Sequence, residues 1–301
     1  GSVVGERMTS VLVFGTTGML GNAVFRYLSR HERYSVCGTT RGTQFHERFP
    51  EDLRAQLIAN VNAEDMDSLC SAMEAAAPQI VINCIGVIKQ LGTAKDPLVS
   101  LPVNAMLPHR LARLCSLRGA RLIHVSTDCV FDGSGGDYLE SDKPDCDDLY
   151  GRSKLLGEVD YPHAITLRTS LIGHELGSSN SLVDWFLSQA HSVKGYRKAI
   201  FSGLPTNEFA RVIADHVLPK PELHGLYHVS SEPISKFDLL TLVAKQYDKV
   251  IDLVPDDTVR IDRSLNSARF RKATGYTPPD WPELVSGMRK FYLDTIAAGG
   301  R

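Results

Sequence analysis

The sequence predicts a doubly wound α/β fold, in which helices cover both faces of a parallel sheet. Short apolar segments alternate with segments of helical periodicity, the strands are apolar almost throughout, and a glycine-rich turn follows the first strand. We expect strands at residues 10–14, 34–37, 79–84, 121–126, 164–168 and 225–229, with a weaker one at 57–61. We expect helices at residues 22–29, 65–76, 108–117 and 150–158.

The domain organisation follows from where this alternation stops. Near-continuous apolar strands indicate burial on both sheet faces, whereas prolines and loops become denser after about residue 170. We therefore expect a nucleotide-binding domain at 8–170, to which a segment around 200–230 returns. A smaller substrate-binding lobe is expected mainly from 171–301. Residues 1–7, ahead of an internal methionine, are interpreted as a remnant of expression cloning.

Composition and charge exclude several classes of function. The 301 residues carry 33 Lys and Arg against 35 Asp and Glu, so no broad basic field for nucleic acid is expected. No apolar run approaches the roughly 18 residues needed to cross a bilayer, so we expect no membrane association. The six cysteines are scattered without metal-ligand spacing, which favours reduced thiols in a cytoplasmic protein and no metal site.

A glycine-rich turn follows the first strand. Gly15, Gly18 and Gly21 are spaced Gly-x-x-Gly-x-x-Gly between that strand and a helix. In this position Gly15 permits a tight turn, Gly18 allows backbone to approach a pyrophosphate, and Gly21 allows close helix–strand packing. The interpretation is a dinucleotide site of the Rossmann type. The alternative is a plain strand-to-helix turn.

The end of the second strand indicates which dinucleotide binds. A carboxylate there would bind the ribose of NAD, but no acid occurs between Val36 and Gln44. Arg41, beside Thr39 and Thr40, could instead hold the 2′-phosphate of NADP(H). The alternative is a solvated loop arginine.

Three residues form a candidate catalytic set. Thr127 follows an apolar strand, and Tyr150 and Lys154 lie one turn apart on the next helix. An ammonium beside the tyrosine is expected to bring its pKa from roughly 10 towards neutrality, so that the phenol can protonate an alkoxide as hydride arrives. Thr127 can hydrogen-bond the same oxygen, and Lys154 can also reach the nicotinamide ribose.

The motifs around these residues resemble the extended short-chain dehydrogenase/reductase superfamily, and within it the dTDP-4-dehydrorhamnose reductase family. The matching segments are 15–21, 83–86, 126–133, 150–158, 167–170 and 203–206. The resemblance covers about residues 10–290. It implies reduction of the keto group of a nucleotide-linked 4-keto-6-deoxy sugar by NADPH or NADH, in deoxysugar or polysaccharide biosynthesis, with Thr127, Tyr150 and Lys154 as the catalytic set.

The resemblance also assigns binding residues. The expected cofactor-binding residues are Gly15, Thr17, Gly18, Met19, Leu20, Gly21, Arg41, Asn62, Cys84, Ile85, Gly86, Asn104, Ser126, Tyr150 and Lys154. The expected substrate-binding residues are Lys89, Asp128, Cys129, Val130, Arg168, Lys194 and Arg263. Among these, Arg168, Lys194 and Arg263 are candidates to hold a diphosphate, because a dianion needs paired donors.

Departures from the family pattern leave alternatives open. Cys129 stands where these reductases usually carry tyrosine, and Lys89 and Gln90 stand near a position where a Tyr-Thr-like pair is usual. The dehydratases of the superfamily carry Thr-Asp-Glu, and that glutamate is missing after Asp128. An epimerase remains possible, as does a regulatory NADP-binding subunit, because the non-catalytic subunit of methionine adenosyltransferase resembles these reductases. A homodimer is possible.

Overall fold

A computed structural model describes residues 7–299; the segment 1–6 of the expected cloning remnant lies outside the described residues. Its centre is a seven-stranded sheet in the order β10-β6-β5-β4-β1-β2-β3, and every neighbouring pair in it is parallel. The strands are β1 (Thr9–Phe14), β2 (Tyr34–Thr39), β3 (Leu57–Ile58), β4 (Ile80–Asn83), β5 (Arg121–Thr127), β6 (Ala164–Thr169) and β10 (Gly225–His228). The seven predicted strands and the doubly wound fold class are thereby confirmed.

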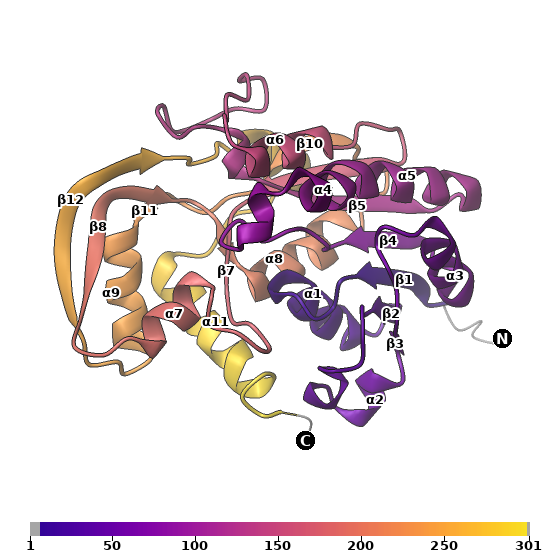
Figure 1. The fold of residues 1–301 in the computed structure, drawn as a ribbon, viewed down its shortest axis with the longest axis horizontal. Helices are drawn as coiled ribbons and strands as arrows, with labels where there is room; N and C mark the ends of the chain where they lie inside the picture. Colours follow the sequence, from indigo (N-terminus) through magenta and orange to yellow (C-terminus); the bar gives the residue numbers. More distant parts are fainter. Residues whose placement is uncertain (1–6, 300–301) are drawn as a thin grey trace.

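Helices cover both faces of this sheet, as Figure 1 shows. Successive strand residues point to opposite faces, so Val11 and Val13 of β1 belong to one apolar cluster and Leu12 and Phe14 to another. The first cluster includes residues of α1 (Met19–Ser29), α8 (Thr206–Val212) and α11 (Trp281–Asp294). The second includes residues of α3 (Met66–Ala76) and α5 (Leu107–Arg118). The predicted helices at 22–29, 65–76 and 108–117 are α1, α3 and α5, and the fourth, at 150–158, is α6 (Leu149–Leu156).

A second, smaller sheet lies beside the first and has the order β11-β8-β12. Its long members β8 (Ser192–Phe201) and β12 (Asp252–Asp262) are parallel neighbours in Figure 1, with α9 (Lys236–Gln246) along them. The short β11 (Ile234–Ser235) pairs with the end of β8 and leads directly into α9. Neither β8 nor β12 was predicted from the sequence. Most side chains of β12 stay in contact with solvent, so this strand lacks a buried apolar pattern.

Short elements complete the described chain. They are η1 (His46–Arg48), α2 (Glu51–Arg54), η2 (Gly92–Lys95), α4 (Pro97–Ser100), η3 (Leu101–Met106), η4 (Asp128–Val130), β7 (Leu171–Ile172), α7 (Leu182–Ser188), β9 (Leu204–Pro205), η5 (Ile213–Val217) and α10 (Ala268–Thr274). Within residues 7–299, no helix combines the length and the apolar character that a membrane crossing requires.

Candidate active site

The glycine turn has the geometry that a dinucleotide phosphate needs. Gly15 adopts a left-handed φ of +89°, and a Cβ there would lie 2.8 Å from the Ile85 side chain. A Cβ on Gly21 would lie 1.8 Å from the carbonyl oxygen of Gly15, so the helix can pack this closely only on a glycine. Gly18 is exposed, and no side chain caps the first N–H groups of α1. These residues fit a pyrophosphate at the start of α1.

The other expected cofactor residues surround this turn. Thr17, Met19 and Leu20 are half-buried at the start of α1, and Cys84, Ile85 and Gly86 follow the carboxyl end of β4. Arg41 is exposed just beyond β2, and Asn62 follows β3, where its side chain accepts a hydrogen bond from the Glu64 amide. Thr39 is a structural residue, because its hydroxyl accepts a hydrogen bond from the Gly15 amide at 3.1 Å. The carboxyl ends of β1 to β4 therefore present one continuous edge for a dinucleotide.

The candidate catalytic residues meet at the end of β5. Lys154 donates a hydrogen bond from its Nζ to the carbonyl oxygen of Val125 at 3.2 Å. Thr127 lies close to Tyr150, because its side chain is among the groups that act on the pKa of the Tyr150 phenol. Lys154 lies beside Gly86, since a Cβ on that glycine would be 3.5 Å from the Nζ atom. The structure thus brings Thr127, Tyr150 and Lys154 to the edge where the expected cofactor residues lie.

Burial changes the protonation of this set. Burial of the ring, followed by the charge of the nearby Cys129 thiolate form, raises the pKa of Tyr150, while the Thr127 side chain acts in the opposite direction. The expectation that the Tyr150 pKa moves towards neutrality is therefore wrong, because burial moves it in the opposite direction. Burial also lowers the pKa of Lys154 from 10.5 to about 8. Tyr150 is accordingly a protonated donor at neutral pH, as the reduction of a carbonyl requires.

A group of charged residues lies on the other side of Tyr150. The Lys89 Nζ donates to the Cys129 Sγ at 3.5 Å and lies 6.0 Å from the centre of the Tyr150 ring. Asp128 is buried, and burial raises the pKa of its carboxyl to about 6. Arg263 donates through Nε to the Phe131 carbonyl oxygen at 2.8 Å, and its charge also acts on Asp128. Lys89, Asp128, Cys129 and Arg263 therefore share one side of the site.

Lys236 joins this group although the sequence analysis missed it. It is the first residue of α9, and β11 just before it pairs with Ile200 and Phe201 at the end of β8. Burial lowers the pKa of Lys236, and the next largest influences are the charges of Asp128 and Arg263. In the sequence, nothing distinguishes Lys236 from the other basic residues of the second lobe. The structure identifies it, because α9 begins next to the site.

Three expected substrate residues lie elsewhere. Arg168 is buried, and its guanidinium makes a two-point ion pair with Glu158, so it cannot hold a diphosphate. Lys194 of β8 pairs with Val254 of β12. It lies six residues along β8 from Ile200, which pairs with Asp262, the residue before Arg263. At about 3.3 Å per residue this is roughly 20 Å from the site. The Val130 side chain is fully buried in a cluster with Phe131, Tyr138 and Leu265.

Two expected cofactor residues have structural roles instead. The buried amide of Asn104 accepts from the Val87 N–H at 2.9 Å and donates to the Ser153 hydroxyl at 3.1 Å, which ties the loop after β4 to α6. The Ser126 hydroxyl donates to Glu158 at 2.6 Å and is likewise buried. Both side chains are therefore held by protein partners.

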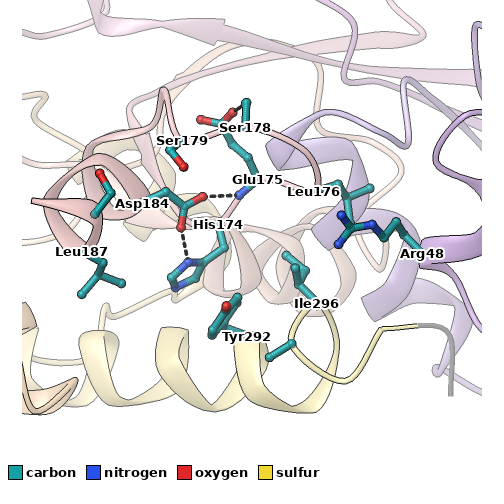
Figure 2. Close-up of a pocket in the computed structure, with 12 residues that line it drawn as sticks. Arg48, His174, Glu175, Leu176, Ser178, Ser179, Asp184, Leu187, Tyr292 and Ile296 are labelled. Carbon is teal, nitrogen blue, oxygen red and sulfur yellow. Dashed lines mark hydrogen bonds and ion pairs between the residues drawn. The ribbon is translucent and has the colours of Figure 1, made fainter.

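A separate cavity of about 530 Å³ lies away from these residues (Figure 2). Its lining includes His174, whose Nδ1 is 2.5 Å from Asp184, and Tyr292 of α11, which stacks on the His174 ring. His174 also contacts the Tyr247 hydroxyl at 2.8 Å. These contacts join α7, α9 and α11. None of Thr127, Tyr150 and Lys154 lines this cavity.

Among the described residues no group of His, Cys, Asp and Glu has the arrangement of a metal site, and all six cysteines are free thiols.

Comparison with known proteins extends these observations. A probable low-salt glycan biosynthesis reductase of Haloferax volcanii is 34% identical over 177 residues, a stretch that covers 57% of this chain and 56% of that protein. Subunit beta of methionine adenosyltransferase 2 from Rattus norvegicus is 30% identical over 79% of this chain and 72% of its own length. The solved structure of dTDP-4-dehydrorhamnose reductase from Bacillus anthracis, in complex with NADP, has a TM-score of 0.77 at 21% identity and covers 96% of this chain and 100% of that one.

The fold and the family are therefore established together. The solved structure shares the doubly wound sheet and its second lobe at low sequence identity. The profile of the RmlD substrate binding domain family matches residues 8–288, nearly the whole of the described chain. The chain belongs to the RmlD substrate binding domain family.

Proposed function

We propose that this protein is an NADPH-dependent oxidoreductase that reduces the C4 keto group of a nucleotide-linked 4-keto-6-deoxy sugar, as in deoxysugar or polysaccharide biosynthesis. The observation that carries the proposal is the meeting of Thr127, Tyr150 and Lys154 at the end of β5, beside the glycine turn of α1. Membership of the RmlD substrate binding domain family supports the same conclusion.

The site residues can perform this reduction. NADPH, when bound along the carboxyl ends of β1 to β4, supplies the hydride. The Thr127 and Tyr150 hydroxyls lie near each other, so a carbonyl oxygen placed between them can accept from both. As negative charge develops on that oxygen, the Tyr150 phenol donates its proton. The Lys154 ammonium stabilises the negative charge that is left and can bind the nicotinamide ribose.

The substrate's diphosphate would bind on the side of Tyr150 that carries Lys89, Lys236 and Arg263. These three cations act on one buried carboxylate, that of Asp128. An excess of positive charge in a partly buried cleft suits a dianion, which needs several donors at once. Arg263 thus stays a proposed diphosphate contact, and Lys236 takes the place of Arg168 and Lys194.

The direct experiment is a substrate screen. NADPH oxidation, followed by absorbance, should be observed with at least one dTDP- or UDP-linked 4-keto-6-deoxy sugar. NADPH binding without turnover of any such sugar would contradict the reductase. It would favour a regulatory subunit, in line with the relative from Rattus norvegicus. Conversion of a nucleotide sugar without net NADPH oxidation would indicate an epimerase. The cytoplasmic location and the homodimer stay predictions.

Cofactor selectivity gives a first quantitative test. Arg41→Ala should weaken NADPH binding by about 10- to 100-fold, since a hydrogen bond to a charged group contributes about 1.5–3 kcal/mol. NADH binding should stay nearly unchanged, because NADH lacks the 2′-phosphate. Dissociation constants for both cofactors, measured by fluorescence, check the prediction. Equal losses for the two cofactors would show that Arg41 does not contact the phosphate.

The diphosphate contacts give a second test. Lys236→Met and Arg263→Met should each raise KM for the sugar nucleotide by about 10- to 100-fold, for the same energetic reason, while NADPH affinity changes little. Lys194→Met is the matched control, because this exposed lysine of the same lobe lies far from the site. A larger KM effect at Lys194 than at Lys236 would mean that the diphosphate binds further along β8.

A further inference from the structure

The last three residues of β5 each lie against a different side chain of the α6 segment. The Val125 carbonyl accepts from Lys154 at 3.2 Å, the Ser126 hydroxyl donates to Glu158 at 2.6 Å, and the Thr127 side chain lies close enough to Tyr150 to act on its pKa. Tyr150, Lys154 and Glu158 are spaced four residues apart, and the Glu158 amide still donates to the Leu155 carbonyl just after α6 ends. The end of the strand is therefore a template for the proposed catalytic pair and for one acid outside it.

Glu158 is fixed by a row of side chains across three strands. Arg168 faces Ser126 in the register of β5 and β6, and His228 faces Arg168 in the register of β6 and β10. Arg168 donates through Nε and Nη2 to the two carboxylate oxygens of Glu158, both at 2.7 Å, and its Nη1 lies 3.1 Å from His228 Nε2. Burial lowers the pKa of His228 to about 4, so the neutral ring accepts this bond and its Nδ1 donates to the Tyr138 carbonyl at 2.9 Å.

The position of Glu158 matters for Lys154. The titratable groups whose charges act on or respond to the ammonium are His124 of β5, Cys84 after β4, Cys129 of η4 and Glu158 after α6. Burial raises the pKa of the Cys84 thiol to about 12 and also raises that of Cys129, so both stay uncharged at neutral pH. Burial lowers the pKa of His124, which is therefore neutral as well. Of these four groups only Glu158 can be an anion that offsets the desolvation of Lys154.

We propose that Glu158, held by Arg168 and Ser126, is a positioning residue that keeps the Lys154 ammonium charged and fixes the strand end that carries Thr127. A buried ion pair seldom adds stability over a well-packed apolar pair, so stability alone is a weak reason for Glu158 and Arg168 to be charged here. The charged pair is explained instead by the effect of the Glu158 carboxylate on Lys154, which lies one helical turn earlier in the chain. The inference rests on the proposed roles of Lys154 and Thr127 in the reductase.

The test measures the pH dependence of NADPH binding, with no sugar present. In the wild type, affinity should fall above about pH 8, where Lys154 loses its proton. Glu158→Gln keeps the size of the side chain and removes its charge, so the midpoint of this loss should move down by about one pH unit. Because this change leaves Arg168 buried without its ion-pair partner and the protein can then fail to fold, the same measurement is made on Glu158→Gln/Arg168→Met, which removes both charges. A smaller downward shift is expected, because loss of the Arg168 charge offsets part of the loss of the carboxylate.

Ser126→Ala is the matched control. It deletes one hydrogen bond to Glu158 but leaves the carboxylate charged, so the pH midpoint should stay where it is in the wild type while kcat with a confirmed substrate falls several-fold. A folded double variant with the wild-type midpoint would overturn the proposal. Because NADPH binding is read without a sugar, failure of the substrate screen would not be confused with failure of this inference.

Discussion

Replacing Tyr150 by Phe should lower kcat by about 10²–10⁴-fold, the usual contribution of general acid catalysis, while NADPH affinity changes little. The substitution removes the proton donor but keeps the ring that lies between Lys89 and Thr127. Burial raises the pKa of the phenol, so it is protonated throughout the neutral range, and the tyrosinate left after each turnover takes a proton back from solvent. Steady-state kinetics with the substrate from the screen, together with NADPH titration, check the expectation.

Thr127→Val provides the graded control. It has nearly the same shape and removes one hydrogen bond to the carbonyl oxygen, so its kcat should fall between those of the wild type and Tyr150→Phe. Near-normal turnover by Tyr150→Phe would contradict the mechanism. Asp128 would then be the first donor to examine. Because burial raises the pKa of its carboxyl to about 6, residual activity that depends on Asp128 should increase as the pH falls through 6.

The sheet was predictable because its strands carry a strong signal. Strands buried on both faces are apolar almost throughout, and β1 shows why: its alternate residues enter two different clusters. The candidate site was predictable for a related reason. Gly15 and Gly21 have close backbone neighbours that no other residue would tolerate, and Tyr150 and Lys154 must lie one helical turn apart to reach the same strand.

The second lobe was less predictable, because solvent contact weakens its pattern. In β12, proline and several charged residues occur in a strand whose side chains mostly stay exposed, and the alternation of a half-buried strand is lost. The roles of individual arginines depend on burial that spacing cannot reveal. Arg168 was expected to hold a diphosphate but is paired inside the sheet, whereas Lys236 reaches the site only because β11 turns α9 back towards it.

Replacing Lys154 by Met should weaken NADPH binding and lower kcat at least as much as the change at Tyr150. The ammonium would contact the nicotinamide ribose and would also stabilise the tyrosinate left by proton transfer, so both binding and chemistry lose an interaction. The wild-type affinity should decline above about pH 8, whereas the affinity of Lys154→Met should show no such decline. Lys89→Met is the control, since it removes another cleft lysine and should keep the decline.

Stability should respond to Lys154→Met in the opposite direction to activity. The pKa of Lys154 is lowered from 10.5 to about 8 on folding, so the folded state binds this proton less tightly than the unfolded state does. Burial of the ammonium therefore costs stability below pH 8, and this cost disappears as the pH rises from about 8 to 10.5. The Tm of Lys154→Met should exceed that of the wild type at pH 7, and the difference should shrink across that interval. A lower Tm at pH 7 that does not depend on pH would show that the bond to Val125 outweighs the desolvation of the ammonium.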